Sequence, residues 1–125
     1  QEALDGDFPL CEENGVGIIV GAPFASGILA TGAKEGAYYK YAPATPEILE
    51  RTAKIETVCK GHGVSLIAAA LQFPLHHPVV NAIIPGALTP EHVSSNAEKS
   101  VQEIPPDLWA ELKQEGLIRK DSPTP

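Results

Sequence analysis

Two short runs of β-branched residues interrupt an otherwise helical pattern of hydrophobic and polar positions. Residues 16–21 read Val-Gly-Ile-Ile-Val-Gly, and residues 79–84 read Val-Val-Asn-Ala-Ile-Ile. Apolar runs of this length, bounded by glycine or proline, are typical of buried parallel strands. Roughly 60 residues of loop and helix separate the two runs. The strands can therefore lie side by side only as a parallel pair joined by a right-handed crossover.

Apolar residues recur at helical spacing in five further segments, three of which begin at a recognisable N-cap. Thr45 and Thr89 are each followed by proline and glutamate, an arrangement that opens helices. Ser65 precedes a nearly all-apolar segment, which Pro74 is expected to kink in its last turn. We expect helices over residues 3–14, 46–60, 66–75, 90–100 and 106–115, with Val93, Ala97 and Val101 inward in the fourth and with Leu108, Trp109 and Leu112 as the apolar stripe of the fifth.

The remaining segments are a long loop and a short tail. Residues 22–44 are rich in glycine and alanine and show no helix or strand pattern. An unstructured stretch of this length in a compact domain is usually functional. Residues 119–125 contain two prolines and are expected to form a flexible tail.

The fold class is α/β, with too little sheet for a closed domain. Two parallel strands leave both edges of their sheet open, whereas parallel sheets are normally buried. A (β/α)₈ TIM barrel, which needs about 250 residues, would supply the missing strands. We therefore interpret residues 1–125 as a single partial domain, the C-terminal part of such a barrel, incomplete as given.

Composition and charge narrow the classes of partner. The chain has a formal net charge of −7 and 43% hydrophobic residues, so a globular fold is expected and a nucleic-acid partner is not. No apolar run approaches the length of a membrane span, and the first residues do not resemble a signal peptide. Cys11 and Cys59 form no metal or redox motif, and we interpret both as small core residues of a cytoplasmic protein.

Three groups of polar side chains are weaker candidates for chemistry. Residues 38–41, Tyr-Tyr-Lys-Tyr, place a phenol beside an amine, but no apolar pocket is evident around them. We interpret them as loop packing and not as a general acid. His76 and His77 close a helix without a third ligand nearby, so we expect no metal site. His62 is interpreted as a helix-terminating residue.

Two loops remain, and each follows a strand. Residues 21–27 read Gly-Ala-Pro-Phe-Ala-Ser-Gly, and residues 85–89 read Pro-Gly-Ala-Leu-Thr and lead into a helix. Barrel enzymes build their sites at the C-terminal ends of strands, and the loops after the last two strands commonly bind phosphate. A helix N-terminus adds unpaired N–H groups and positive partial charge. We expect phosphate or pyrophosphate recognition here, with an ordinary β-to-α connection as the alternative.

Three motifs, in order, resemble the C-terminal part of the aldo-keto reductase family. They are residues 16–27, the His-Gly-Val-Ser of residues 62–65 with the alanine-rich segment behind it, and residues 83–96. The resemblance covers essentially the whole chain and is greatest to the L-fucose (D-threo-aldose) and pyridoxal dehydrogenase branch. It implies a (β/α)₈ barrel that binds NAD or NADP and moves a hydride between the nicotinamide and a carbonyl or alcohol, such as a sugar or a pyridoxal-like aldehyde.

The resemblance also implies roles for individual residues. No catalytic residue is named, because the catalytic residues of the family come from the first half of the barrel. Gly21 stands where many members place an aromatic residue against the nicotinamide. The implied pyrophosphate-lining residues are Ala22, Phe24, Ser26 and Gly27, and the implied adenosine-side residues are Gly86, Ala87, Thr89, His92 and Asn96.

Cofactor preference is an expectation from residues that this chain lacks. Members that prefer NADP hold its 2′-phosphate with a Lys-Ser pair after the last strand and an Arg in the next helix. Gly86, Ala87 and His92 occupy those places here. Each lost charge-assisted contact is worth about 1.5–3 kcal/mol, so we expect NAD to be preferred over NADP. A protonated His92 would favour NADP at acidic pH.

Two other functions stay open at the level of the sequence. The chain can be a non-catalytic fragment or subunit that associates, with itself or with another chain, through exposed sheet edges. It can also belong to a phosphate-binding barrel enzyme of another class, such as an isomerase. The identity of the substrate does not follow from these residues, because most of the parts that would contact it lie outside them.

Overall fold

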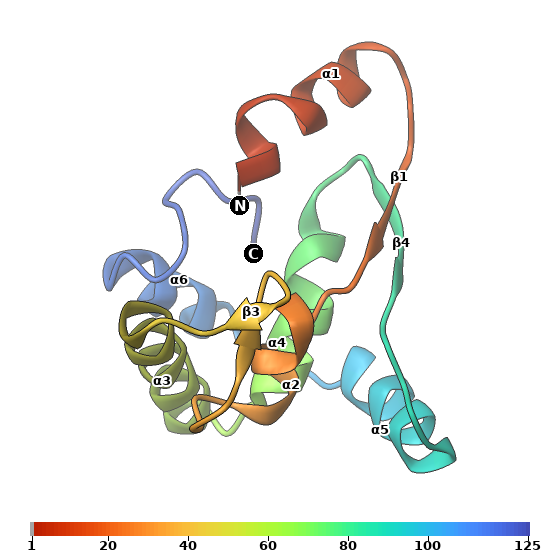
Figure 1. Cartoon of the computed structure of the whole chain (residues 1–125). Helices are drawn as coiled ribbons and strands as arrows, with labels where there is room; N and C mark the ends of the chain where they lie inside the picture. The colour runs from red at the N-terminus through yellow and green to blue at the C-terminus, as the bar shows by residue number, and fades with distance from the viewer. Residues whose placement is uncertain (1) are drawn as a thin grey trace.

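The computed structural model describes residues 2–125 as a group of helices on one side of a two-stranded parallel sheet (Figure 1). None of its helices is long and apolar enough to cross a membrane. The elements, in chain order, are η1 (Glu2–Asp5), α1 (Asp7–Glu13), β1 (Ile18–Gly21), η2 (Ala25–Gly27), α2 (Ile28–Thr31), β2 (Tyr38–Tyr39), β3 (Ala42–Pro43), α3 (Pro46–Gly61), α4 (Leu66–Gln72), η3 (Phe73–His76), β4 (Val80–Ile84), α5 (Pro90–Ser100) and α6 (Pro106–Gln114).

The two predicted strands, β1 and β4, pair in parallel, which confirms the sequence prediction. The register runs from Ile18 opposite Val80 to Gly21 opposite Ile84, with one irregularity after Ile18. Because the strands are parallel and end opposite one another, their C-terminal ends lie at the same edge of the pair. The loops that follow β1 and β4 therefore begin side by side.

Only one face of this strand pair is buried, so the expectation of fully buried strands is wrong for half of their side chains. On the buried face, Val20 and its register partner Ile83 are half-buried, and Ile83 packs against the cluster that includes Leu71 of α4. Val80 is also buried, but it pairs before the irregularity that follows Ile18. Ile19 and Ile84 are each 63% exposed. Successive side chains of a strand point to opposite faces, and within residues 2–125 no element covers the second face.

Helix starts follow the local chemistry of their capping residues. The side-chain oxygens of Thr45, Ser65 and Thr89 each accept a hydrogen bond from the backbone N–H three residues later, at 3.5, 3.1 and 3.3 Å. These are the N-caps of α3, α4 and α5, as predicted. Pro74 also acts as expected, because α4 ends at Gln72 and continues as the tighter η3.

The N-terminal region is not the single helix expected over residues 3–14. Gly6 has a non-helical backbone, with φ −145°, and separates η1 from α1. Glycine lowers helix stability by about 1 kcal/mol relative to alanine, which is enough to break a short helix that starts with few internal contacts. α1 then ends at Glu13, close to the predicted stop.

Residues 22–44 contain more structure than the sequence suggested. They form η2, α2 and an antiparallel hairpin of β2 and β3. The hairpin turns at Lys40 and Tyr41, whose φ angles are 49° and 63°. Two consecutive positive φ angles define the type I′ turn, which normally takes Asn-Gly. Since neither residue is typical of this turn, no hairpin was predicted from the sequence.

The main core lies between α3, α4 and α6 and is centred on the predicted stripe of Leu108, Trp109 and Leu112, each at most 2% exposed. Cys59 of α3 joins this core with no exposed surface, whereas Cys11 is half-buried, and both thiols are free.

The orientation predicted for α5 is wrong. Val93 is 59% exposed and Val101 is 82% exposed, and α5 has no fully buried residue. The half-buried face of α5 is the polar one, which includes Ser95 and Lys99. Gln72 of α4 donates hydrogen bonds to the carbonyls of Lys99 and Gln102 at 3.1 and 2.7 Å. These polar contacts tie the C-terminal end of α5 to α4.

The C-terminal segment, residues 119–125, packs against the start of the chain in this structure. Arg119 forms ion pairs with Asp5 and Asp121, each at 2.6 Å. Ser122 is 3% exposed. The flexibility expected for this segment in solution stays a prediction.

Candidate functional site

The two loops that the sequence singled out leave the same edge of the sheet. β1 ends at Gly21 and β4 ends at Ile84, and these residues are register partners. Figure 1 shows both strands running toward the same end, where the segment after β1 leads to α2 and the segment after β4 leads to α5. The structure thus brings together the starts of residues 22–27 and residues 85–89.

The loop after β1 has an unusual backbone. Ala22, Ala25, Ser26 and Gly27 have φ angles of 51°, 49°, 64° and 102°. Non-glycine residues with positive φ are uncommon and cost about 1–3 kcal/mol each where strained, so they persist where surrounding contacts enforce them. Such backbone strain is concentrated at ligand-binding sites, which makes this loop the strongest candidate site in the chain.

Two contacts hold the loop in this conformation. Phe24 is 8% exposed and packs with Ala70 and Leu71 of α4. The Oγ atom of Ser26 accepts a hydrogen bond from the N–H of Tyr41 at 3.0 Å, which joins the loop to the β2–β3 hairpin. Because a hydroxyl is both donor and acceptor, Ser26 keeps its own proton to donate. Phe24 therefore anchors this loop in the core, and its contact with a cofactor stays a prediction.

The loop after β4 is tied back to α5 by two side chains. The backbone N–H of Leu88 donates to Nδ1 of His92 at 3.3 Å. Nδ2 of Asn96 donates to the carbonyl of Gly86, also at 3.3 Å. Gly86 has no heavy atom within 4 Å of the place where a Cβ would stand. Packing therefore does not require a glycine at this position, and there is open space beside the backbone of Gly86.

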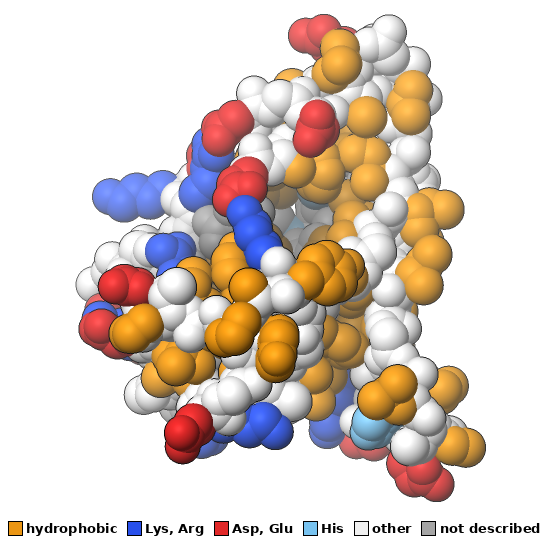
Figure 2. All heavy atoms as spheres, viewed as in Figure 1, with side chains coloured by type: hydrophobic (Ala, Val, Ile, Leu, Met, Phe, Trp, Pro, Cys, Tyr) orange, Lys and Arg blue, Asp and Glu red, His pale blue; other side chains and the backbone are white. Residues whose placement is uncertain are grey.

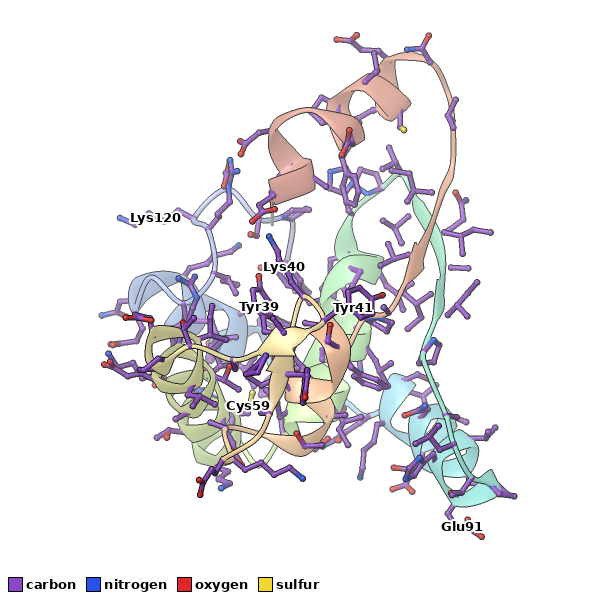
Figure 3. The ribbon with its side chains drawn as sticks, viewed as in Figure 1. Tyr39, Lys40, Tyr41, Cys59, Glu91 and Lys120 are labelled. Carbon is purple, nitrogen blue, oxygen red and sulfur yellow. The ribbon has the colours of Figure 1, made fainter. Side chains whose placement is uncertain are left out.

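Charge at this edge is set by a single acidic side chain. Residues 22–27 and 85–89 contain no charged side chain, whereas Glu91 lies in the first turn of α5 (Figure 3). Hydrogen bonds, first from its own backbone N–H and then from Thr89, hold the pKa of Glu91 below its ordinary value. A carboxylate therefore already interacts with the positive end of α5.

Of the tyrosines of residues 38–41, which the sequence predicted to pack in the loop, Tyr39 is half-buried but the other two are exposed. Tyr38 is 51% exposed and Tyr41 is 88% exposed at the turn of the hairpin. Lys40 points away from the strand ends toward the N-terminus (Figure 3), where its Nζ lies 3.0 Å from a carboxylate oxygen of Glu2. Lys40 also lies over the ring of Tyr39, with its Nζ 5.8 Å from the ring centroid.

The histidine pair after α4 packs on aromatic rings. His76 lies edge-on to Trp109 at 5.2 Å, and His77 lies edge-on to Phe8 at 4.7 Å. Burial, and then the charge of Lys113, lower the pKa of His76. Within residues 2–125, no three His, Cys, Asp or Glu side chains form a group that could hold a metal ion.

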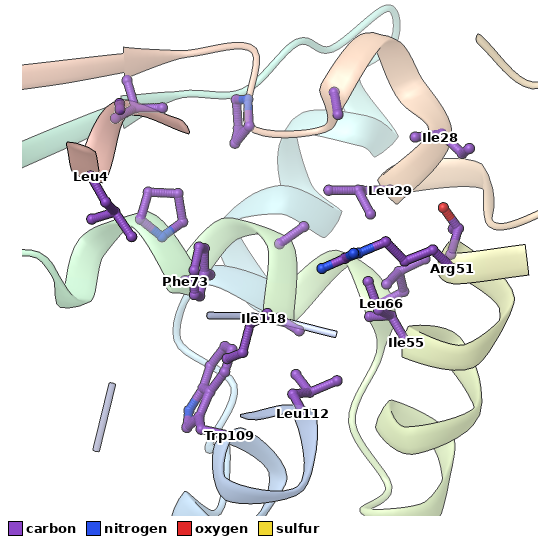
Figure 4. A pocket seen from close by; sticks show the side chains of 18 of the residues that line it. Leu4, Ile28, Leu29, Arg51, Ile55, Leu66, Phe73, Trp109, Leu112 and Ile118 are labelled. Carbon is purple, nitrogen blue, oxygen red and sulfur yellow. The ribbon is translucent and has the colours of Figure 1, made fainter. Parts of the chain in front are cut away.

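A largely apolar cavity of about 490 Å³ lies behind the loop after β1 and was not evident from the sequence (Figure 4). Its walls come from α1, α2, α3, α4 and α6, among other segments, and it reaches the loop at Pro23 and Ala25. Arg51, its only Lys or Arg side chain, donates to the carbonyls of Gly116 and Leu117. Hydrophobic side chains also surround the recess below α1 in Figure 2.

The amino-acid sequence of this chain matches a known family. The profile of the Aldo/keto reductase family matches residues 5–117, so the chain belongs to the aldo-keto reductase family. The α/β architecture, with its parallel strand pair, is consistent with part of the (β/α)₈ barrel of that family.

Two curated relatives support the branch that the motifs suggested. The chain is 39% identical over 126 residues to the D-threo-aldose 1-dehydrogenase of Pseudomonas sp, an alignment that covers 100% of this chain and 37% of that protein. It is 38% identical over 110 residues to the pyridoxal 4-dehydrogenase of Microbacterium luteolum, covering 88% of this chain and 32% of that protein. The chain thus spans about a third of the length of these relatives.

Proposed function

We propose that this chain is the cofactor-binding C-terminal portion of an NAD(P)-dependent oxidoreductase. The observation that carries the proposal is the convergence of two loops at the C-terminal edge of the β1–β4 pair. One loop has four positive φ angles in six residues, and the other leads into the N-terminus of α5. Family membership supports nicotinamide chemistry at such an edge.

The residues of the two loops fit the two ends of a dinucleotide. Ser26 can donate its hydroxyl proton to a pyrophosphate oxygen, and Ala22 and Gly27 would let the backbone approach it. On the adenosine side, Gly86 and Ala87 offer backbone without bulk, and Thr89, His92 and Asn96 shape the loop. Gly21 offers no aromatic face to the nicotinamide, so stacking there would depend on residues outside this chain.

A bound nicotinamide would supply the hydride acceptor or donor, and the chain's own residues would bind and orient it. Proton transfer to the substrate is assigned to residues outside this chain. The substrate class is an aldehyde or alcohol of the sugar or pyridoxal type, because the two relatives are named for such compounds. The cytoplasm is the location that fits two free thiols.

We infer that NAD is preferred over NADP. The 2′-phosphate of NADP would approach the first turn of α5, where Glu91 is held ionised. No Lys or Arg lies in residues 85–92 to offset this negative charge. A phosphate and a carboxylate repel each other, so the site would disfavour NADP for two reasons. Glu91 repels the 2′-phosphate, and no cationic side chain binds it.

A chimaera tests the proposal directly. Residues 1–125 would replace the matched region of the Pseudomonas D-threo-aldose 1-dehydrogenase, and NAD binding would be followed by fluorescence quenching. We expect NAD binding and aldose oxidation, with the truncated relative lacking the region as the negative control. A chimaera that folds cooperatively, as judged by circular dichroism, but does not quench with NAD would contradict the proposed function.

A second candidate function rests on the exposed apolar surface. Ile19 and Ile84 on the open face of the sheet, Val93 of α5 and Val101, the C-cap of α5, are 59–82% exposed. A sheet with unpaired edges is a template for association. This surface favours a chain that pairs with another polypeptide, either a second copy or the rest of a barrel.

A further inference from the structure

The largely apolar cavity behind the loop after β1 is separate from the surface that the two loops offer to a cofactor. None of the residues predicted to bind the cofactor lines it. Its volume of about 490 Å³ lies within the range of about 300–1,000 Å³ that is typical of small-molecule pockets. Leu29 of α2, Ile55 of α3 and Phe73 of η3 are among its lining residues. The cavity can therefore bury the apolar part of a ligand.

Arg51 of α3 gives this cavity a positive charge. Of the described residues that line it, Arg51 is the only Lys or Arg, and none is Asp or Glu. Figure 4 shows the guanidinium pointing from α3 into the cavity. Its Nη2 donates to the carbonyls of Gly116 and Leu117 at 3.3 and 2.6 Å, and these are its only hydrogen bonds to residues 2–125. Because a guanidinium carries five N–H groups, those of Nε and Nη1 remain available to a ligand.

We propose that this cavity binds an amphipathic carboxylate, a small molecule whose apolar chain or ring enters the cavity and whose carboxylate pairs with Arg51. A guanidinium binds a carboxylate through charge-assisted hydrogen bonds, which are stronger than those between neutral groups. No acidic side chain among the described lining residues competes for Arg51. The proposal does not depend on the proposed function, because the cavity and the cofactor loops present different residues.

The burial of the lining residues indicates how the ligand is oriented. Arg51 is exposed to solvent over part of its surface, whereas Ile28, Trp109 and Leu112 are each at most 2% exposed. The carboxylate therefore lies toward solvent at Arg51, where removing an anion from water costs least. The apolar part lies against the buried residues. A sugar does not fit this pattern, because its many hydroxyls would find few hydrogen-bond partners among apolar side chains.

The test uses the chimaera, whose completed barrel would cover the open sheet edges, so that self-association of the isolated chain does not enter the measurement. Isothermal titration calorimetry follows the binding of decanoate, at concentrations where it stays monomeric, and of decanol, which has the same chain without the charge. Arg51→Met removes the guanidinium, whereas Arg51→Lys keeps a positive charge. Leu29→Trp fills the cavity, and Leu75→Trp, at a 40% exposed position outside the lining, is its matched control. Circular dichroism checks that each variant is folded.

We expect decanoate to bind more tightly than decanol. Arg51→Met should weaken decanoate binding about tenfold or more and leave decanol binding unchanged, and Arg51→Lys should weaken decanoate binding less. Leu29→Trp should weaken the binding of both probes, and Leu75→Trp that of neither. Decanoate should still bind when NAD is saturating.

Three results would overturn the proposal: a folded chimaera that does not bind decanoate, an Arg51→Met variant that binds it as tightly as the parent, or displacement of decanoate by NAD. Failure of NAD binding alone would instead contradict the proposed function.

Discussion

His62, the C-cap of α3, places Nε2 at 2.7 Å from a carboxylate oxygen of Glu111 on α6. The sequence indicated that His62 ends a helix, which the structure confirms, but not that it contacts a second helix. The side chains of this pair are 20% and 48% exposed, so the contact lies at the rim of the α3–α6 interface. The apolar core beneath it should contribute most of the stability.

The first prediction compares this rim contact with the core. Trp109→Ala should lower the free energy of unfolding by about 3–5 kcal/mol, because it empties a fully buried site. Glu111→Gln should cost about 1 kcal/mol or less, as partly exposed ion pairs do. Urea denaturation of the three proteins measures both values. A larger loss in Glu111→Gln than in Trp109→Ala would show that polar contacts dominate the packing of α6.

The second prediction concerns Gly86. Gly86→Val should leave stability nearly unchanged, because a Cβ there meets no neighbour within 4 Å. In the chimaera it should weaken NAD binding, because it fills the space beside the loop backbone. Gly27→Val is the matched comparison, since Gly27 has a φ of 102° that a side chain rarely adopts. That variant should lose stability as well as affinity.

The third prediction concerns coenzyme choice and Glu91. Glu91→Gln should raise kcat/KM for NADP relative to NAD, because it removes the charge that opposes a 2′-phosphate. The pKa of Glu91 is depressed in the folded state, so its stabilising contribution is present above the ordinary carboxyl pKa and is lost as the pH falls through the lower, folded value. The effect on coenzyme choice should persist throughout the neutral range. Equal ratios in the parent and the variant would refute the role of Glu91.

The fourth prediction uses the two thiols. Cys59 has no exposed surface, and burial raises its pKa to about 11. Because the thiolate is the reactive form, Cys59 should resist alkylation until the chain unfolds. Cys11, which is half-buried in α1, should react first. Mass spectrometry after timed iodoacetamide treatment gives the order. Early labelling of Cys59 would indicate that the core between α3, α4 and α6 opens readily.

The fifth prediction concerns association of the isolated chain. The exposed apolar face of α5 and the open sheet edges should cause self-association at micromolar concentration. Val101→Asp should reduce it without loss of helix content, because Val101 is 82% exposed. Glu98→Asp on the same helix serves as a neutral control. Sedimentation velocity distinguishes the outcomes, and a monomer at every concentration would disprove the expectation.

Elements governed by short-range chemistry could be predicted from the sequence. The N-caps at Thr45, Ser65 and Thr89 and the change of helix type before Pro74 depend only on neighbouring residues. The parallel pairing of β1 and β4 also followed, since few topologies connect two distant strands. The convergence of the two loops is a consequence of that pairing.

Elements governed by tertiary contacts could not be predicted. The apolar stripe of α5 points outward, and Gln72 of α4 binds carbonyls at the C-terminal end of this helix. Periodicity carries no information about which face of a helix packs against its neighbour. The β2–β3 hairpin depends on a turn without its usual residues, and the cavity depends on side chains from five α-helices. At the candidate site, the hydrogen bonds that His92 and Asn96 make with the loop after β4 likewise depend on how α5 is oriented.

The separation in sequence of β1 and β4 also affects how the chain folds. The contacts of α4 with α3 and with α6 close shorter loops than the pairing of residues 18–21 with residues 80–84, and pairings across long separations are slow to form. The helical core should therefore assemble first and the strand pair later. Since both candidate loops take their position from the strand ends, a dinucleotide should bind only the product of the last folding step. Added cofactor would then slow unfolding without accelerating refolding.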